Sequence, residues 1–582
     1  MKLDYNQKSD NFIAVTDVDV ETIVVSSLLT AHKVMLTWHI KPVDFIVLKN
    51  RFDEIDSNLD MTEAAKERVQ KIIEVLELNK VIKSGNNFKL NLSGIKAKLY
   101  LDQLRGVALL SRFSGAGLFD EMGIGKTLQA LSIFKLLKNN GIARKAVVIC
   151  PLSVKEVWMN QIDAYTDLKY VVTGRGKSCI NGIKGGDVLI AHYQNLLQED
   201  FIDFVMNRFD MLIIDEAHWI KNLGAKRSNA IQMLVQQSHR LMPLDKQEYE
   251  LGEVDGKKLV YYVKDKNRPN VLLLTGTPVS ENPMNAYAIM KILGHINVPD
   301  WKWEKHFVEK ELVKVSSHPD LWVNVFKRFK NVEEIGWYME SFSIRRLRKD
   351  VPDMPQKVEE VRYVDLAPEQ AEVYAVIIAG LFNEMKEKKV TIAGAMSKFI
   401  RLTQLTNNLA IISDLPYKAN NKYTEIMSIL EEVKGKVVIW SIYRKGCDLL
   451  QQFLTSKGIK SVVLYGGVNE LEVVKQFVDG DANVAIATPQ KMGTGIDFLK
   501  VADTAIYLDL PVSYVMYKQS QDRLVRRGKD HKVVIIELIA RRTVDEVLKR
   551  ILDRKRKLVD EIRKAVIDLD SFKEMFNFEL KK

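Results

Sequence analysis

The chain has 582 residues, of which 47% are hydrophobic and 28% are charged, a balance typical of globular proteins with several domains. It contains no run of about 18 apolar residues that could span a membrane, and its polar N-terminus does not resemble a secretory signal. Cys150, Cys179 and Cys447 show neither metal-binding nor disulfide spacing, so we expect a reducing compartment. Lysine and arginine exceed aspartate and glutamate by 86 − 75 = 11, which favours a polyanionic partner such as nucleic acid.

The first 95 residues carry no motif that points to a particular chemistry. Short apolar runs come first, and after Thr62 the positions Val69, Ile72, Ile73 and Leu76 repeat at the spacing of one helix face. We therefore predict a small accessory α/β domain. Its role is open between recognising a substrate and stabilising the rest of the protein as a cap.

The segment Phe119–Leu131, FDEMGIGKTLQAL, predicts a loop that binds phosphate groups. Gly123 and Gly125 allow tight turns that bring backbone N–H groups close to an anion. Lys126 can reach the β- and γ-phosphates, and the Thr127 hydroxyl is placed to bind Mg²⁺. The helix that follows presents its positive N-terminus to the same anion. The predicted nucleotide contacts are Met122, Gly123, Ile124, Gly125, Lys126 and Thr127.

Two further positions bear on this loop. The strict pattern has a glycine where this chain has Asp120, which leaves open a simple glycine-rich turn before a core helix. Upstream, Gln103 carries an amide that can bond both a donor and an acceptor on an adenine edge. The loop by itself therefore does not establish nucleotide binding.

Four short, β-branched runs end at Cys150, Ala191, Asp215 and Thr275, a pattern typical of parallel strands buried on both faces. Sheets of this kind bind ligands at the carboxyl ends of their strands. At the third run, we expect Asp215 to hold Mg²⁺ and Glu216 to polarise the attacking water. A solvated acidic turn is the alternative, and the apolar strand directly before it argues against that reading.

Other polar residues follow the same strands. His218 is placed to sense the γ-phosphate, and Thr275, Gly276 and Thr277 are expected beside the nucleotide. Between these motifs, residues 241–269 contain an Asp-Gly turn flanked by alternating segments, which predicts a β-hairpin whose role is unknown.

A second series of buried-strand runs extends from Lys436 to Leu538 and contains no phosphate loop. This second sheet must therefore complete the first site from across a cleft, or bind something else. In KQSQDRLVRRGK, Arg523 and Arg526 are three residues apart and share a helix face. Both can point to one γ-phosphate, where arginine neutralises charge in the transition state. A solvated or phosphate-binding surface is the alternative.

In this order, DEMGIGKT, DEAH and LLLTGTP resemble the Swi/Snf-type ATPases of helicase superfamily 2, a family of chromatin remodellers, recombination translocases, annealing helicases and bacterial and phage relatives. The resemblance covers about Lys96–Val547 and implies two RecA-like lobes, ATP and Mg²⁺ as cofactors, and DNA as a partner. Asp120 is typical of this family, which uses DEMGxGKT. Gln103 matches its glutamine motif, and Gln519, Arg523 and Arg526 fit its pattern QxxDRxxR.

Two more segments carry the resemblance, each with a departure. MGTGIDF resembles the family motif that contacts both DNA and the cleft, which makes Gly495 and Asp497 candidate site residues. Many relatives have asparagine where this chain has Asp497. Val512 stands where relatives commonly have a tryptophan, so any function of that tryptophan is in doubt here.

The resemblance also implies that strand-end loops grip one DNA strand through its phosphates, without base specificity. The candidate loops are Pro151–Lys155, His192–Asn195, Ser441–Arg444 and Thr488–Thr494. The connector between the lobes adds four basic residues, which either touch DNA phosphate or are simply solvated. They are Arg345, Arg346, Arg348 and Lys349.

We predict an α/β protein with two RecA-like parallel-sheet lobes. The expected order is an accessory domain at 1–95, a first lobe at 96–345, a second lobe at 346–545 and a C-terminal helix at 546–582. A helical protrusion is expected at about 284–340, with most of its tryptophans packed in the core. We expect the basic C-terminal helix to brace the lobes rather than to contact DNA.

The predicted function is that of a DNA-dependent ATPase, a helicase or translocase that remodels duplex or branched DNA without sequence preference. Fork remodelling, annealing or branch migration in replication, repair or recombination fits the small insertions. Alternatives are a motor that displaces proteins or RNA polymerase from DNA, a nucleic-acid scaffold with little ATPase activity, and a restriction or defence subunit. We expect a monomer without membrane association, in the cytoplasm of a bacterial or phage-infected cell, or in the nucleus of a eukaryote.

Overall fold

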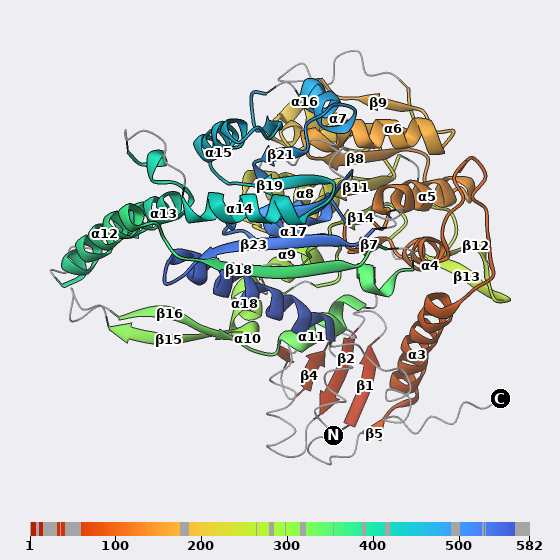
Figure 1. The fold of residues 1–582 in the computed structure, drawn as a ribbon. Coiled ribbons are helices and arrows are strands. Elements are labelled where there is room, and N and C mark those ends of the chain that lie inside the picture. The colour runs from red at the N-terminus through yellow and green to blue at the C-terminus, as the bar shows by residue number, and fades with distance from the viewer. Residues whose placement is uncertain are drawn as a thin grey trace.

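The computed structural model describes most of the chain and places it in two lobes, each built on a parallel sheet, with a smaller N-terminal sheet beside them (Figure 1). The described residues are 2–6, 11–15, 32–34, 37–40, 60–174, 185–241, 243–263, 265–278, 284–296, 298–314, 322–340, 342–352, 354–386, 392–413, 420–468, 470–489, 501–525, 529 and 531–564.

The first lobe has a seven-stranded sheet in the order β17-β7-β14-β11-β8-β10-β9, and all its strand pairs are parallel. Its strands are β7 (Gly115–Leu118), β8 (Ala146–Cys150), β9 (Tyr170–Val172), β10 (Val188–His192), β11 (Met211–Asp215), β14 (Asn270–Leu274) and β17 (Ser343–Ile344). Its helices include α4 (Leu101–Leu110), α5 (Lys126–Asn139), α6 (Lys155–Tyr165), α7 (Glu199–Val205) and α8 (Lys226–Gln237).

Successive residues of β11 enter two different cores. Met211 and Ile213 pack into one hydrophobic cluster, and Leu212 and Ile214 pack into the other. Because side chains alternate across a strand, this division means that both faces of the sheet are covered. The four buried strands predicted from the apolar runs of this lobe are confirmed.

The second lobe has a six-stranded parallel sheet in the order β18-β23-β22-β19-β21-β20. Its strands are β18 (Lys357–Val364), β19 (Lys436–Trp440), β20 (Ser461–Leu464), β21 (Val484–Ala487), β22 (Ala502–Tyr507) and β23 (Val533–Ala540). Its helices are α12 (Pro368–Lys386), α13 (Ile392–Asn407), α14 (Asn421–Glu432), α15 (Arg444–Ser456), α16 (Glu470–Val478), α17 (Tyr514–Asp522) and α18 (Val544–Lys564). The prediction of two parallel-sheet lobes is therefore confirmed.

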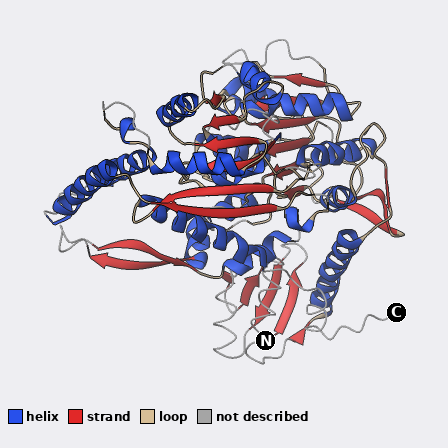
Figure 2. Cartoon of the chain, viewed as in Figure 1, coloured by secondary structure: helices blue, strands red, loops and turns tan. Residues whose placement is uncertain are grey.

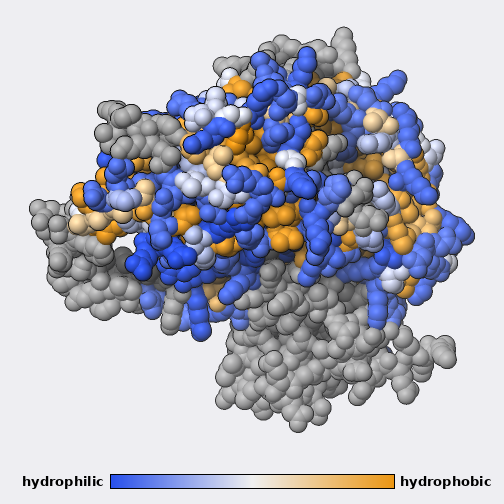
Figure 3. Space-filling view, in the orientation of Figure 1, coloured by the Kyte–Doolittle hydropathy of each residue, from blue (hydrophilic) through white to orange (hydrophobic). Residues whose placement is uncertain are grey.

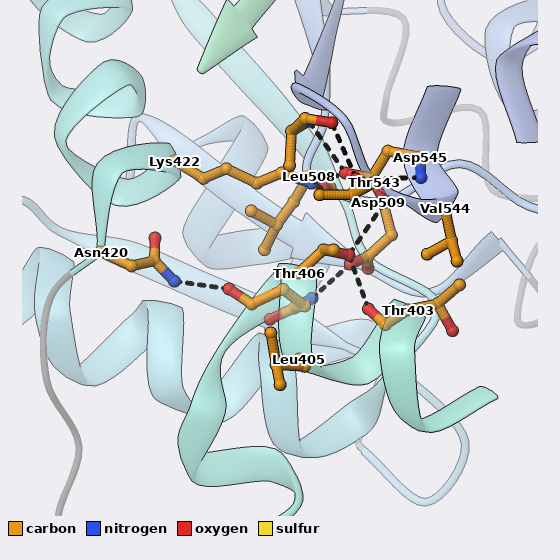
Figure 4. Close-up of polar contacts among 12 residues, drawn as sticks. Thr403, Leu405, Thr406, Asn420, Lys422, Leu508, Asp509, Thr543, Val544 and Asp545 are labelled. Atoms are coloured by element: carbon orange, nitrogen blue, oxygen red, sulfur yellow. Dashed lines mark hydrogen bonds and ion pairs between the residues drawn. The ribbon is translucent and has the colours of Figure 1, made fainter. Parts of the chain in front are cut away.

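A buried polar network joins α13, α14 and the start of α18 in the second lobe (Figure 4). The ammonium of Lys422 donates to the carbonyl of Leu508 at 2.7 Å and pairs with a carboxylate oxygen of Asp545 at 2.7 Å. The hydroxyl of Thr406 donates to the other oxygen of Asp545 at 2.8 Å. Every polar group in this set has a partner, as buried networks require.

The N-terminal sheet has the order β3-β4-β2-β1-β5 and is followed by α3 (Glu63–Ser84), whose first turn is capped by Thr62. Its strands are β1 (Lys2–Asn6), β2 (Asn11–Val15), β3 (His32–Val34), β4 (Thr37–Ile40) and β5 (Asp60–Met61). The C-terminal end of α3 packs on the first lobe, because Ile82 is part of the hydrophobic core of that lobe and Asn79 accepts a hydrogen bond from Arg112 at 2.7 Å.

The segment 241–269 forms the predicted hairpin, with β12 (Glu248–Val254) paired to β13 (Lys257–Tyr262). Asp255 and Gly256 have φ angles of 46° and 78°, as an Asp-Gly turn of this kind needs. β12 also pairs with β6 (Phe88–Leu90), and Tyr261 lies in the core of the first lobe. The insertion therefore extends that lobe.

The helical protrusion predicted at 284–340 is only partly helical. It contains α9 (Met284–Ile292), α10 (Asp300–Phe307) and α11 (Val332–Glu340), but β15 (Val308–Lys314) and β16 (Trp322–Phe329) form an antiparallel hairpin between them. The helix prediction is wrong over this hairpin, where valines alternate with other residues and β-branched side chains favour strands. In this view the hairpin and α12 extend from the same side of the molecule (Figure 1).

The tryptophans of this region differ in exposure: Trp303 is fully buried, as expected for core packing, whereas Trp301 is 63% exposed.

α18 packs against α11 of the first lobe and against α13, α17 and β23 of the second. Figure 2 shows helices flanking the strands of both sheets, and the surface in Figure 3 is mostly hydrophilic with apolar patches near its centre. Among the described helices, none is long and apolar enough to cross a lipid bilayer.

Candidate active site

The predicted phosphate loop follows β7 and leads directly into α5. Gly123 and Gly125 have φ angles of 88° and 89°, a left-handed conformation that glycine adopts without strain. A Cβ at position 125 would lie 2.4 Å from the amide nitrogen of Gln103, so a side chain there would clash as well. No side chain caps the N-terminus of α5. The first backbone N–H groups of α5 are therefore left to a ligand.

The side chains around the loop are held by the protein itself. The ammonium of Lys126 donates to the carbonyl of Asp120 at 2.9 Å. Gln103 accepts from the N–H of Tyr100 at 3.1 Å and donates to the carbonyl of Ile124 at 3.0 Å. Gln103 thus fastens the start of α4 to the loop, and reading an adenine edge would require it to exchange the bond to Ile124.

Asp120, the departure from the strict loop pattern, is fully buried and anchors the loop to the connector. Its carboxylate accepts from the backbone N–H and the Nε of Arg346, both at 3.0 Å, and from the amide of Gln129 at 3.2 Å. A second guanidinium nitrogen of Arg346 donates to Gln129 at 2.6 Å. A glycine at this position could make none of these contacts.

Arg348 contacts the same loop two residues further along. Its guanidinium donates to the carbonyl of Met122 at 2.8 and 3.0 Å, and its backbone N–H donates to the carboxylate of Glu121 at 2.9 Å. The expectation that the connector arginines touch DNA phosphate or are solvated is therefore wrong for Arg346 and Arg348. The sequence missed these contacts because the two segments are 226 residues apart.

The acidic pair lies at the carboxyl end of β11. The Asp215 carboxylate accepts from the indole N–H of Trp158 at 2.8 Å and from the backbone N–H of Glu216 at 2.9 Å. The hydroxyl of Tyr193 donates to the carbonyl of Asp215 at 2.7 Å. Burial, reinforced by the neighbouring charge of Glu216, raises the pKa of Asp215 to about 6. Trp158, which positions this carboxylate, was not predicted from the sequence.

Glu216 has a φ of 53°, a conformation that costs a side-chain-bearing residue free energy and is found at functional sites. Its carboxylate lies 3.1 Å from the Nδ1 of His218. Burial alone would raise the pKa of Glu216, but His218 and the charges of Lys126 and Arg523 outweigh it, so the pKa lies below its ordinary value. The carboxylate is thus kept charged chiefly by His218, with Lys126 of the first lobe and Arg523 of the second adding to the effect.

α17 ends at Asp522, and the predicted arginine of the second lobe, Arg523, is its C-cap residue rather than part of a longer helix. Ser513 caps this helix by accepting from the N–H of Met516 at 3.4 Å. Gln519 and Arg523 line a cavity of about 270 Å³, together with Glu216 and His218 of the first lobe. The structure therefore brings Glu216 and Arg523 to one site.

Some predicted residues stand apart from this arrangement. Arg526, Gly495 and Asp497 lie outside the described residues. The hydroxyl of Thr275 is buried and accepts from the N–H of Thr277 at 3.2 Å, whereas Gly276 and Thr277 line a larger cavity of about 520 Å³ beside the connector.

The chain matches the model of the SNF2-related domain over residues 53–244 and 255–411, and that of the helicase conserved C-terminal domain over residues 421–528. The chain belongs to the SNF2-related family.

Among curated relatives, this SNF2-related chain is 24% identical to nuclear protein STH1/NPS1 of Saccharomyces cerevisiae over 490 residues, covering 77% of the chain and 33% of that protein. It is 22% identical to the ATP-dependent helicase YqhH of Bacillus subtilis, covering 84% of each. It thus spans about a third of the yeast protein and most of the bacterial one. Among solved structures, the SWI2/SNF2 ATPase core of Sulfolobus solfataricus in complex with dsDNA covers 85% of the chain and 99% of that structure, with 22% identity and a TM-score of 0.36.

The residues of this SNF2-related site fit a nucleoside triphosphate and Mg²⁺. A cation would favour the charged form of Asp215, which is buried next to a second carboxylate, and Thr127 lies in the first turn of α5 with a hydroxyl that can bind Mg²⁺. Within the described ranges, no group of three or more His, Cys, Asp or Glu residues could hold a metal ion. Mg²⁺ usually takes one or two carboxylates together with phosphate oxygens of a bound nucleotide.

The four loops expected to contact DNA follow strands of the two sheets. Pro151–Lys155 and His192–Asn195 follow the neighbouring strands β8 and β10, and Ser441–Arg444 follows β19. Thr488 and Pro489 follow β21, and residues 490–494 lie outside the described ranges. Pro151 and Pro489 line the same cavity as Glu216 and Arg523, so loops of both lobes meet at the catalytic cleft.

Proposed function

We propose that this SNF2-related chain hydrolyses ATP with Mg²⁺ and uses the cycle to translocate on duplex or branched DNA, remodelling forks, annealing strands or moving branch points in replication, repair or recombination. The observation that carries the proposal is the position of Glu216. Its carboxylate lines one cavity with Arg523 of the second lobe, and the charges of Lys126 and Arg523 both lower its pKa. A base flanked by cations from two lobes suits a phosphoryl transfer that depends on lobe closure.

In this proposal the residues divide the work as follows. Lys126 exchanges its bond to the Asp120 carbonyl for phosphate oxygens, while N–H groups from Met122 to Thr127 surround the anion. Thr127 and Asp215 would hold Mg²⁺, which neutralises phosphate charge. Glu216 orients and polarises the attacking water, since its lowered pKa keeps it charged.

Arg523 would stabilise the charge that develops on the γ-phosphate, with Gln519 beside it in the same cavity. Arg526, Gly495 and Asp497 are proposed to complete the nucleotide site from the second lobe. Because Arg523 belongs to the second lobe, catalysis requires a closed cleft, and loss of the γ-phosphate removes a charge that attracts Arg523 toward the first lobe.

Coupling to DNA rests on the strand-end loops of both lobes. If the loops of β8 and β10 hold one stretch of a DNA strand and those of β19 and β21 hold the next, each closure and reopening becomes a step. A net charge of +11 supports a polyanionic track. The proposed unit is a monomer that acts in the cytoplasm or nucleus.

The proposed domains are an accessory domain at 1–95, lobes at 96–345 and 346–545, and a helix that braces the lobes at 546–582. The position of α18 against both lobes supports the brace. The insertions are small, which favours rewinding or branch migration over sliding of nucleosomes.

The deciding experiment measures ATP hydrolysis without nucleic acid and with single strands, duplex, a fork and a four-way junction. We expect duplex or branched DNA to stimulate turnover at least about tenfold, because DNA favours the closed lobes. Lys126→Ala is the background control. Equal rates on all substrates would refute the DNA-motor proposal, and stimulation by single strands alone would contradict the duplex track.

A further inference from the structure

Residues of α17 line two separate cavities between the lobes. One face of the helix carries Gln519 and Arg523 toward the catalytic cavity with Glu216. The opposite face, with Lys518 and Gln521, lines the cavity of about 520 Å³ beside the connector. Whatever holds this second face sets where Arg523 points.

Two ion pairs hold that face to the phosphate loop and the connector. The ammonium of Lys518 lies 2.9 Å from the carboxylate of Glu121, which belongs to the phosphate loop. The guanidinium of Arg348 lies 2.7 Å from the carboxylate of Asp522, the residue immediately before Arg523. Because Lys518 and Asp522 are four residues apart, the two pairs act on the same side of α17, one turn from each other.

Arg348 connects these pairs to the loop itself. While one nitrogen of its guanidinium contacts Asp522, the others donate to the carbonyl of Met122, and its backbone N–H donates to Glu121. One side chain therefore links the phosphate loop to the arginine helix of the other lobe. The planar fork of arginine makes both contacts at once, which lysine cannot do.

The groups are charged and shielded from solvent. Arg348 is 7% exposed and Asp522 is 3% exposed. Burial would raise the pKa of Glu121, but the charges of Lys518 and Arg348 lower it to about 2. Burial would lower the pKa of Lys518, but Asp522 and Glu121 raise it above its ordinary value. Water screens such pairs far less than it screens exposed ones.

We propose that Glu121, Arg348, Lys518 and Asp522 form an inter-lobe clasp that sets the position of Arg523 relative to Glu216. These are positioning residues, and the inference rests on the proposed ATPase function of that site. The two bridges fix both the distance and the rotation of α17, so that a change in the phosphate loop is transmitted to the arginine. Misplacing a catalytic group by about 1 Å can cost 100-fold in rate.

The test compares Asp522→Asn, Arg348→Gln and Lys518→Met with Arg362→Gln, whose ion pairs with Glu360, Glu425 and Glu432 lie within the second lobe. With saturating DNA, we expect the clasp variants to lose about 10- to 100-fold in kcat while KM for ATP changes less than about threefold, since none of the replaced side chains is proposed to contact the nucleotide. Arg362→Gln should keep kcat within about twofold.

The double variant Arg348→Gln/Asp522→Asn separates a clasp from two independent contacts. We expect it to lose about as much kcat as either single variant, because the two residues act as one unit. Arg348→Lys should not restore the rate. Multiplied losses, a rise in KM with normal kcat, or kcat values like those of Arg362→Gln would each overturn the proposal. Thermal melting identifies any variant that fails to fold, and the isosteric Asp522→Asn then carries the test.

A second measurement does not depend on activity. Small-angle X-ray scattering of the nucleotide-free protein should show a larger radius of gyration for Arg348→Gln and Asp522→Asn than for the wild type and Arg362→Gln, because loss of the clasp frees the lobes. Unchanged scattering would contradict the clasp even if the wild type proved to hydrolyse no ATP. A wild type that hydrolyses no ATP would refute the proposed function and not the clasp.

Discussion

Asp215 and Asp509 occupy matching places in the two lobes. Each is a buried carboxylate at the carboxyl end of an apolar parallel strand, β11 in the first lobe and β22 in the second. Asp509 accepts from the amide of Asn407 at 2.6 Å, the hydroxyl of Ser441 at 2.7 Å and the N–H of Ile442 at 3.0 Å. Asp215 accepts from one indole and one backbone N–H, with a second carboxylate beside it.

The difference shows that the same position at the end of a parallel strand can have a structural role in one lobe and a chemical role in the other. Burial raises the pKa of both carboxylates, and in both a lysine and hydrogen bonds oppose it. For Asp215, however, the neighbouring charge of Glu216 adds to the rise, whereas no second carboxylate adds to that of Asp509. Asp509 sits beside the network of Figure 4 and ties the strand end to α13. The carboxylate of Asp215 accepts only two of these hydrogen bonds, so its oxygens can also bind a cation. A saturated strand-end carboxylate stabilises the fold, whereas an underpartnered one is available for chemistry.

The largest effect should come from the acidic pair of the first lobe. Glu216→Gln should reduce ATP turnover about 1,000-fold, or about 4 kcal/mol in barrier height, because an amide cannot polarise the attacking water. Nucleotide binding, measured with a fluorescent ATP analogue, should persist. Asp509→Asn is the matched control in the second lobe, and a loss of similar size in it would erase the contrast between the lobes.

The next effect concerns stability in the second lobe. Lys422→Met should lower the free energy of unfolding by about 3–5 kcal/mol, because it leaves the carboxylate of Asp545 buried without its cation. Urea titration followed by circular dichroism measures this loss. Adding Asp545→Asn should recover part of it. If Lys422→Met unfolded at the wild-type urea concentration, the network would not be the structural element described above.

A smaller effect is expected in the pH dependence of stability, where the contribution of Asp215 can be measured apart from that of Asp509. The folded-state pKa of Asp215 is raised from 3.8 to about 6, so the folded protein binds more protons than the unfolded chain in this range and loses stability as pH rises through it. At pH 7 without Mg²⁺, Asp215→Asn should therefore be more stable than the wild type, by up to about 3 kcal/mol. Asp509 shifts in the same direction but is common to both proteins, so the difference isolates Asp215.

Urea midpoints of both proteins from pH 4 to pH 7 check this expectation. Mg²⁺ with a nucleotide should reduce the difference, because a bound cation favours the charged carboxylate. A difference that does not depend on pH would mean that Asp215 is ionised at the same pH in the folded and unfolded states.

The smallest effect is expected at the surface. Arg362 pairs with three glutamates of the second lobe, two of which are 45% and 57% exposed at their side chains. Arg362→Gln should cost at most about 1 kcal/mol in urea titration, since solvent screens such pairs. A larger loss would show that charge contacts stabilise this lobe outside its buried network as well.

The sequence was informative wherever local pattern decides structure. Buried strands, the glycines of the phosphate loop and the strand-end acids at 215 and 216 follow from apolar runs and motif spacing. Asp120 with Arg346, and Trp158 with Asp215, could not be predicted because tertiary packing alone brings them together. A run of basic residues in a connector has the same composition whether it is solvated, touches DNA or, as for Arg346 and Arg348 here, contacts carboxylates within the protein.

The hairpin β15–β16 was missed for another reason. Its apolar and aromatic residues lie between two helices, and short apolar runs do not distinguish helix from strand by spacing alone. Only the alternation of valines in β16 favoured a strand there.

The pairing of β17 with β7 has a consequence for biosynthesis. The N–H groups of Gly117 and Phe119 donate to the carbonyls of Phe342 and Ile344, residues translated more than two hundred positions later. Until they leave the ribosome, the strand that leads to the phosphate loop remains an open edge, which is prone to pair with other chains. Nascent chains that stop short of the connector should therefore aggregate or depend on chaperones, and the nucleotide pocket is completed only when translation of the second half has begun.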